Sequence, residues 1–192
     1  MRVIYVLISM FLIISCSDDS VLPKPKAHLR LEYPKAVYEP FSYTYFEFEK
    51  SKYSKIERLS DKKINLAYPF MKAKIYLTYN EVQQNLEELI RDAEKLTYKH
   101  TNMADEIFPP RNFINEEKSV FATFNMVTGE AASPIQFHAT DSIKHFLTGS
   151  LYFYAHPNYD STMPAIKYIQ KDIIHLIETL KWKNKQQKNT DD

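Results

Sequence analysis

Two histidines and one aspartate in the C-terminal half of the sequence have the residue types of a metal site. His138, Asp141 and His145 fall within eight residues, and two histidines with one carboxylate form a known ligand set for divalent metals. A histidine beside a carboxylate can also act as a general base. No HExxH spacing and no second carboxylate support the metal hypothesis, and histidines in such a position are more often ordinary turn or surface residues. A metal-dependent enzyme is therefore a less favoured alternative.

Other catalytic patterns find less support in the sequence. Neither Ser133 nor Ser150 lies in the Gly-x-Ser-x-Gly elbow of a serine hydrolase. The chain contains only two glycines, Gly129 and Gly149, which excludes the glycine-rich phosphate loops of nucleotide-binding proteins. We expect Gly149 to mark a bulge or a close approach of another backbone. We expect the segment 140–142 (Thr-Asp-Ser) to form a turn or a helix cap.

The single cysteine follows an apolar segment at the start of the chain. Arg2 precedes the apolar run Val3–Ile14, and Ser15 and Cys16 follow it. A charged end, a short apolar run and a small residue are typical of a secretory signal, and the cysteine completes a lipobox. The run is shorter than the roughly 20 residues that a membrane-spanning helix needs. We predict that residues 1–15 are a lipoprotein signal peptide and that Cys16 is the lipid attachment site, with an ordinary cleaved signal as the alternative.

Composition limits what the remaining chain can do. Without residues 1–15 the sequence has 24 basic and 24 acidic residues, so no nucleic-acid-binding surface is predicted. If Cys16 carries lipid, no cysteine is left for a disulfide or a thiolate zinc site. Fourteen tyrosines and twelve phenylalanines indicate either a β-rich aromatic core or an interface. No cofactor is predicted.

Alternating patterns predict strands along most of the chain. Residues 16–40 contain several prolines and are expected to form a lipid-proximal tether followed by an irregular wrap. The charged stretch 50–63 is expected to be a surface loop or the end of a hairpin. The period of two that marks half-buried strands, or a β-prone aromatic composition, defines six predicted strands: 41–48, 64–68, 73–79, 120–127, 135–140 and 146–155.

Two amphipathic helices complete the prediction. The first is expected over 81–103, with Asn80 as its N-cap, and the second over 162–182, with Pro164 in its first turn. Helices with one apolar face need a surface to cover, and a largely antiparallel sheet is the natural partner. We therefore predict a single α+β domain over residues 41–182, with a mostly antiparallel β-sheet packed by two amphipathic helices. Residues 183–192 are predicted to be a disordered polar tail.

The aromatic strand near the C-terminal end supports a second function. In residues 146–154 apolar or aromatic side chains occur at both the odd and the even positions, so the strand is expected to be covered on both faces. One cover would be a helix, and the other could be a binding partner. The alternatives are an envelope binding module, with an exposed aromatic platform for glycan or protein, and simple core packing.

Four longer segments resemble one known family. The sequence is similar to the GldD gliding motility lipoproteins in the segments 22–26, 29–34, 89–98 and 136–160, and the resemblance covers essentially the whole chain after the signal. It implies a cell-envelope lipoprotein, anchored in the outer membrane by acyl chains such as palmitate, that is needed for gliding motility and for the type IX secretion machinery.

The same resemblance implies protein partners, in particular other gliding and secretion lipoproteins, and no catalytic residues. From the residues and the resemblance together we predict a non-enzymatic structural or assembly component of the envelope. The glycan- or protein-binding module and the metal-dependent enzyme that would use His138, Asp141 and His145 remain as alternatives.

Overall fold

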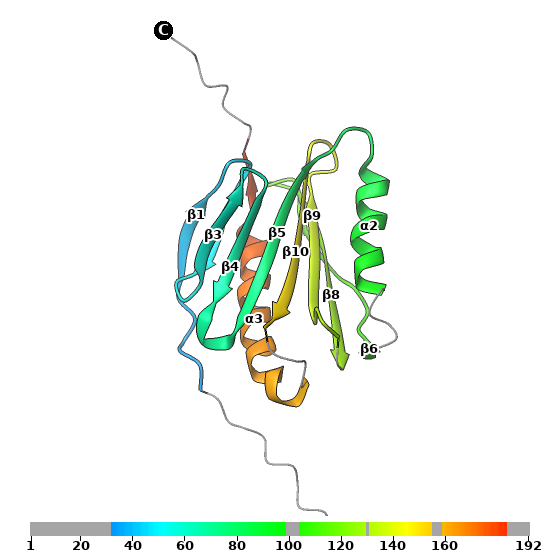
Figure 1. The fold of residues 1–192 in the computed structure, drawn as a ribbon. Coiled ribbons are helices and arrows are strands. Elements are labelled where there is room, and N and C mark those ends of the chain that lie inside the picture. Colours follow the sequence, from blue (N-terminus) through cyan, green and yellow to red (C-terminus); the bar gives the residue numbers. More distant parts are fainter. Residues whose placement is uncertain (1–31, 99–103, 130, 155–158, 184–192) are drawn as a thin grey trace, which may run out of the picture.

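The fold is built on one large antiparallel sheet. The structure, a computed structural model, describes residues 32–98, 104–129, 131–154 and 159–183. Among these residues eight strands form the sheet, in the order β3-β4-β5-β10-β9-β8-β6, with β7 also paired to β8 (Figure 1). Their bounds are β3 Lys55–Ser60, β4 Lys63–Tyr68, β5 Ala73–Glu81, β6 Ala104–Ile107, β7 Arg111–Asn115, β8 Val120–Gly129, β9 Ile135–Thr140 and β10 His145–Phe153. The short 3-10 helix η1, Pro69–Met71, joins β4 to β5.

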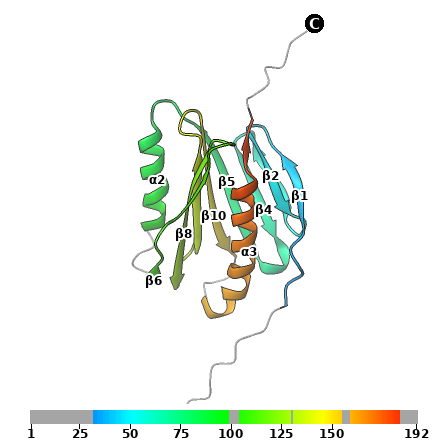
Figure 2. The ribbon, with the colours of Figure 1, turned by 180° about the vertical axis from the view of Figure 1, so that it is seen from behind.

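The two helices lie on opposite faces of this sheet (Figures 1 and 2). Helix α3, Tyr159–Thr179, packs on one face together with a small three-stranded sheet of β1 (Tyr38–Ser42), β2 (Phe46–Ser51) and β11 (Lys181–Trp182). Helix α2, Leu86–Tyr98, lies over β9 and β10 on the other face. These elements confirm the predicted α+β class, with two helices against a mostly antiparallel sheet.

The hydrophobic core lies between the large sheet, α3 and the small sheet. Helix α3 places an apolar stripe in this core: Ile166, Ile169, Ile173, Leu176 and Ile177. Phe46 on β2 and Tyr45 in the turn before it approach Tyr79 on β5, and the Tyr45 and Tyr79 rings stack with centroids 4.2 Å apart. The aromatic content noted in the sequence is thus used in part to join the two sheets.

One buried carboxylate ties α3 to strands from both sheets. Asp172 accepts hydrogen bonds from the hydroxyl groups of Tyr68 on β4, at 3.0 Å, and Tyr38 on β1, at 3.1 Å. Burial raises the pKa of the Asp172 carboxyl, although the two tyrosine hydrogen bonds oppose that rise. The Asp172 carboxylate is therefore stabilised by two hydroxyl donors, one from each sheet.

Gly149 occupies a position in β10 where a side chain would collide with an aromatic ring. Gly149 pairs with Phe137 on β9, and a Cβ atom built on Gly149 would lie 2.1 Å from Cε1 of Phe137. Neither expected role of Gly149 is found, because the register runs through it without a bulge and the group that approaches closely is a side chain and not a backbone. The ring of Phe137 covers the gap that the glycine leaves in the sheet.

The N-terminal strand predictions need correction. The segment predicted as one strand over 41–48 is a hairpin, because β1 ends at Ser42 and the N–H of Tyr43 donates to the carbonyl of Phe46 at 2.8 Å. Strand β1 begins at Tyr38, so residues 38–40 form part of a strand and not part of the irregular wrap predicted up to residue 40. The charged stretch 50–63 contains β3 and the turn into β4, so of the two expected forms it is the end of a hairpin and not a surface loop.

The first helix is shorter than predicted. Asn80 is not an N-cap, because β5 continues to Glu81, and Gln84 then adopts a left-handed φ of 61°. The described helix ends at Tyr98, and residues 99–103 lie outside the described residues. The second helix begins at Tyr159 and ends at Thr179, before β11. Strands β6 and β7 were not predicted, since charged residues and Pro109-Pro110 obscure their pattern.

Candidate functional site

The three side chains proposed as a metal site do not come together. His138 pairs with Thr148 in the β9–β10 ladder, whereas His145 begins β10 in the opposite parity. Because successive side chains of a strand point to opposite faces, His138 lies on the α2 face of the sheet and His145 on the core face. Among the described residues no group of three His, Cys, Asp or Glu side chains is placed to hold a metal ion. The metal hypothesis for these three residues is therefore wrong.

Asp141 organises the turn between β9 and β10. Its Oδ1 accepts hydrogen bonds from the backbone N–H groups of Ile143 at 3.0 Å and of Lys144 and His145 at 2.8 Å each. Partial burial raises the pKa of Asp141, but these backbone donors outweigh it, and the net pKa is lowered. The alternative interpretation of residues 140–142, as a turn made by short oxygen-bearing side chains, is confirmed.

His145 is buried among aromatic side chains of the core. Its Nδ1 lies 2.8 Å from the Tyr79 hydroxyl, and its ring stacks on that of Trp182. Burial lowers the pKa of His145, so the imidazole is neutral at pH 7. Both histidines are buried, contrary to the expectation that they are ordinary surface or turn residues.

The α2 face of the sheet carries rows of uncharged polar side chains. The strand register places five such residues in one row across β4, β5, β10, β9 and β8: Asn65, Tyr76, Ser150, Gln136 and Asn125. The neighbouring row continues the same chemistry on β5, β10, β9 and β8: Thr78, Thr148, His138 and Thr123. Amide, hydroxyl and imidazole groups can donate and accept hydrogen bonds without charge. The two rows therefore form a neutral hydrogen-bonding surface.

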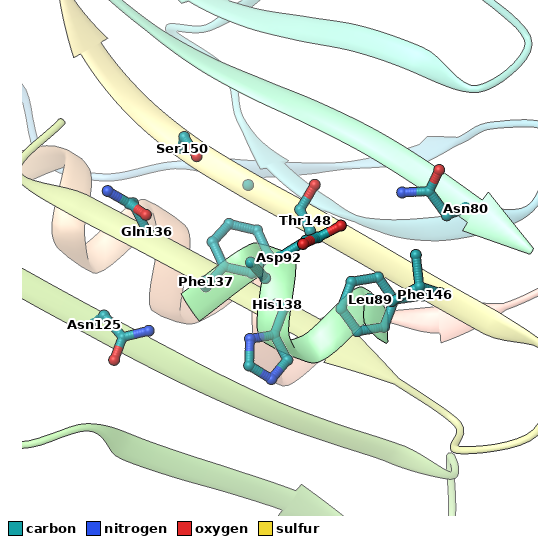
Figure 3. Close-up of a pocket in the computed structure, with 12 residues that line it drawn as sticks. Asn80, Leu89, Asp92, Asn125, Gln136, Phe137, His138, Phe146, Thr148 and Ser150 are labelled. Atoms are coloured by element: carbon teal, nitrogen blue, oxygen red, sulfur yellow. The ribbon is translucent and has the colours of Figure 1, made fainter. Parts of the chain in front are cut away.

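A cavity of about 340 Å³ lies between this surface and α2. Figure 3 shows Gln136, His138, Thr148 and Ser150 on the sheet side, with Leu89 and Asp92 from α2 across from them. Asp92 is 61 % exposed and is paired with Lys95 at 3.1 Å. The charged group thus sits at the rim, and the floor of the cavity is neutral.

His138 is positioned by an aromatic neighbour in the floor of this cavity. Its ring stacks on Phe146 with centroids 5.6 Å apart and planes 17° apart. Burial is the main cause that lowers the pKa of His138, with Glu94 acting weakly in the opposite direction. The neutral imidazole offers one donor and one acceptor. This arrangement suits binding through hydrogen bonds better than it suits proton transfer.

The polar surface continues into an open area beyond the cavity. Tyr76 on β5 and Tyr152 on β10 form an edge-to-face pair with centroids 5.4 Å apart, and Tyr76 is 40 % exposed. At the end of β10 the Lys74 ammonium lies 5.2 Å from the Tyr154 ring centroid and pairs with Glu57 at 2.7 Å. The aromatic strand predicted over 146–155 is therefore partly core and partly open surface.

The sequence of this chain matches a known family. The chain matches the family described as gliding motility lipoprotein GldD over residues 18–182. The chain is a member of the GldD gliding motility lipoprotein family. No curated protein sequence matches the chain. The match ends at Trp182, the residue that stacks on His145 at the start of β10.

As a gliding motility lipoprotein, the chain is expected to be held at a membrane by lipid. Neither described helix has the length and apolar character that crossing a bilayer requires. Cys16, the predicted lipid attachment site, lies outside the described residues.

Sequence reasoning had missed the polar face of this GldD-family domain. A signal was present in β9, where Gln136, His138 and Thr140 alternate with Ile135 and Phe137. Only the strand order shows that polar positions of β5, β8 and β10 continue the same rows.

Proposed function

We propose that this protein is a lipid-anchored, non-enzymatic component of the cell envelope that supports gliding motility and the type IX secretion machinery. The observation that carries the proposal is the family match over residues 18–182, which spans the folded domain and the segment before it. The separation of His138 from His145 by the sheet removes the one catalytic alternative with a named residue set.

The mechanism that we propose is positional. Cys16 would carry two or three acyl chains, palmitate among them, and each buried methylene contributes about 0.8 kcal/mol to membrane affinity. Restriction to the outer membrane raises the effective concentration of the domain for partners in the same plane. The partners that we propose are other gliding and secretion lipoproteins, which the domain would hold and align.

The position where the described chain enters the domain supports this arrangement. The chain enters at the end of the sheet that carries η1 (Figure 1), and the Tyr33 ring packs near Tyr168 in α3, with centroids 5.2 Å apart. At this end Phe70 is 98 % exposed, and Tyr154, whose N–H donates to the Lys72 carbonyl at 2.8 Å, is exposed as well. Aromatic and lysine side chains favour the membrane interface. We therefore propose that this end faces the membrane that holds the lipid.

Substitution of the cysteine tests the anchored role. We expect Cys16→Ala to give a folded protein that incorporates no radiolabelled palmitate, leaves the membrane fraction and restores little or no gliding in a deletion strain. Ser17→Ala is the matched control, because it changes a neighbouring residue and leaves the lipidated thiol intact. Full gliding by a Cys16→Ala protein that carries no lipid would show that the anchor is not part of the function.

A further inference from the structure

The α2 face of the sheet retains polar side chains where a packing surface would not need them. Gln136, His138, Asn125 and Ser150 are at most 9 % exposed, although removing polar groups from water costs free energy unless hydrogen bonds replace those to solvent. Apolar residues at these positions would support a helix at lower cost. The residues of this face therefore have the composition of a binding surface.

The side chains that α2 turns toward the cavity do not explain why the floor of the cavity is polar. Leu89 and Ala93 line the cavity from α2 together with Asp92, so two of these three α2 residues are apolar. Figure 3 shows Leu89 and Asp92 on the α2 side of the cavity, with Gln136, His138 and Ser150 on the sheet side. An apolar helix face and a polar sheet face do not complement each other in a dry contact. A molecule with one apolar and one hydrogen-bonding side would fit between them, and the volume of about 340 Å³ lies in the lower range of ligand pockets.

We propose that this face binds a neutral carbohydrate chain, with one sugar unit in the cavity beside Gln136 and Ser150 and the chain continuing over Tyr76 and Tyr152. A sugar ring has an apolar C–H face for Leu89 and hydroxyl groups that both donate and accept. Aromatic side chains commonly offer such ligands a flat contact surface beside polar groups. The row from Tyr76 through Ser150 and Gln136 to Asn125 joins the open and enclosed parts of the surface.

The charges around the face favour a neutral ligand over an ionic one. Among the described residues that line the cavity there is no lysine or arginine, and the carboxylate at its rim, Asp92, would repel an anion. Lys74, on the open area, is already paired with Glu57. His138 adds no positive charge at neutral pH because burial lowers its pKa. This inference goes beyond the proposed envelope role and does not depend on the lipid anchor.

Calorimetric titration of the lipidated full chain with neutral oligosaccharides tests the proposal. The probes are maltotetraose, cellotetraose and the tetramer of N-acetylglucosamine, and the protein is held in a detergent without a sugar head group, since a glycosidic detergent would compete. We expect at least one probe to bind. We expect Gln136→Leu to weaken that binding by about tenfold or more, because it removes hydrogen bonds inside the cavity.

Gln170→Leu on α3 is the matched control and should bind as the unchanged protein does. Thermal unfolding of both variants separates loss of binding from loss of fold, and Tyr76→Ala provides a second binding variant on the open surface. The proposal would be overturned if none of the three probes bound at millimolar concentration, or if Gln136→Leu and Gln170→Leu weakened binding equally. Specific crosslinking of this face to a protein, with no sugar bound, would also overturn it.

Discussion

The imidazole ring of His145 stacks on the indole ring of Trp182, with centroids 5.2 Å apart and planes only 6° apart. The Trp182 Nε1–H also donates to the carbonyl of Ser119 at 2.9 Å. One side chain thus joins the last described strand to the start of β10 and to the turn before β8. This contact makes the C-terminal end of the family domain part of the core.

Removal of the indole is expected to destabilise the whole domain. We expect Trp182→Ala to lower the free energy of unfolding by about 2–3 kcal/mol, somewhat less than the usual loss for truncation of a large buried aromatic residue, because the ring is partly exposed. Urea unfolding followed by circular dichroism measures the change. Trp182→Phe keeps a ring for stacking and loses only the N–H bond, so it should cost less. Equal losses for the two variants would contradict a role for stacking.

Acid should destabilise the fold partly through His145. Burial lowers the pKa of its imidazole below the ordinary value of 6.5, so the unfolded chain binds this proton more tightly. The stability that the neutral ring contributes is complete above pH 6.5 and is lost as the pH falls through the lower folded-state pKa. We expect His145→Gln to show a smaller loss of unfolding free energy between pH 7 and pH 5.

Protonation of Asp172 has the opposite effect and raises the free energy of unfolding as the pH falls, because burial raises the pKa of its carboxyl in the folded state. Its contribution is the same in the unchanged protein and in His145→Gln, so the comparison isolates the histidine. An identical acid loss in both proteins would show that His145 does not titrate as described.

A methyl group at Gly149 should disturb the packing of Phe137. The Cβ of Gly149→Ala would fall 2.1 Å from the buried ring, and such overpacking costs about 1–3 kcal/mol. The smaller side chain of Phe137→Leu leaves room for the methyl group, so the double variant should lose less than the sum of the two single losses. Additive losses in urea unfolding would argue against a direct collision.

The fold class could be predicted because its main signals are local. The apolar stripe of α3 and the alternation in β5, β8 and β9 each depend on a single segment. The turn at Tyr43–Tyr45 could not be predicted, since aromatic residues continue through it and no glycine or proline marks it. Strands β6 and β7 depend on pairing with β8, a tertiary interaction that overrides their weak local pattern.

The candidate site was less accessible to sequence reasoning for a geometric reason. His138 and His145 are close in sequence, and a tight turn could have brought them together. They are seven positions apart, and the β9–β10 register pairs residues of like parity, so their side chains lie on opposite faces of the sheet. The partners that do line the cavity with His138, such as Asn80 and Leu89, come from β5 and α2, far earlier in the chain.

The proposed orientation on the membrane can be tested with single labels. In a protein lipidated at Cys16, as proposed, the cysteine sulfur is held in a thioether, so Phe70→Cys or Ile143→Cys supplies the only free thiol for a fluorophore. Phe70 and Ile143 are both highly exposed but lie at opposite ends of the large sheet. In vesicles containing brominated lipids we expect strong quenching at position 70 and little at position 143. Equal quenching at both positions would contradict the orientation.

The central claim is that this member of the GldD family serves the motility and secretion machinery of the envelope. The most direct measurement deletes the gene and scores surface spreading and the profile of secreted proteins in the same strain. The account predicts that both are lost and that the unchanged gene restores both. Normal spreading with normal secretion in the deletion strain would contradict it.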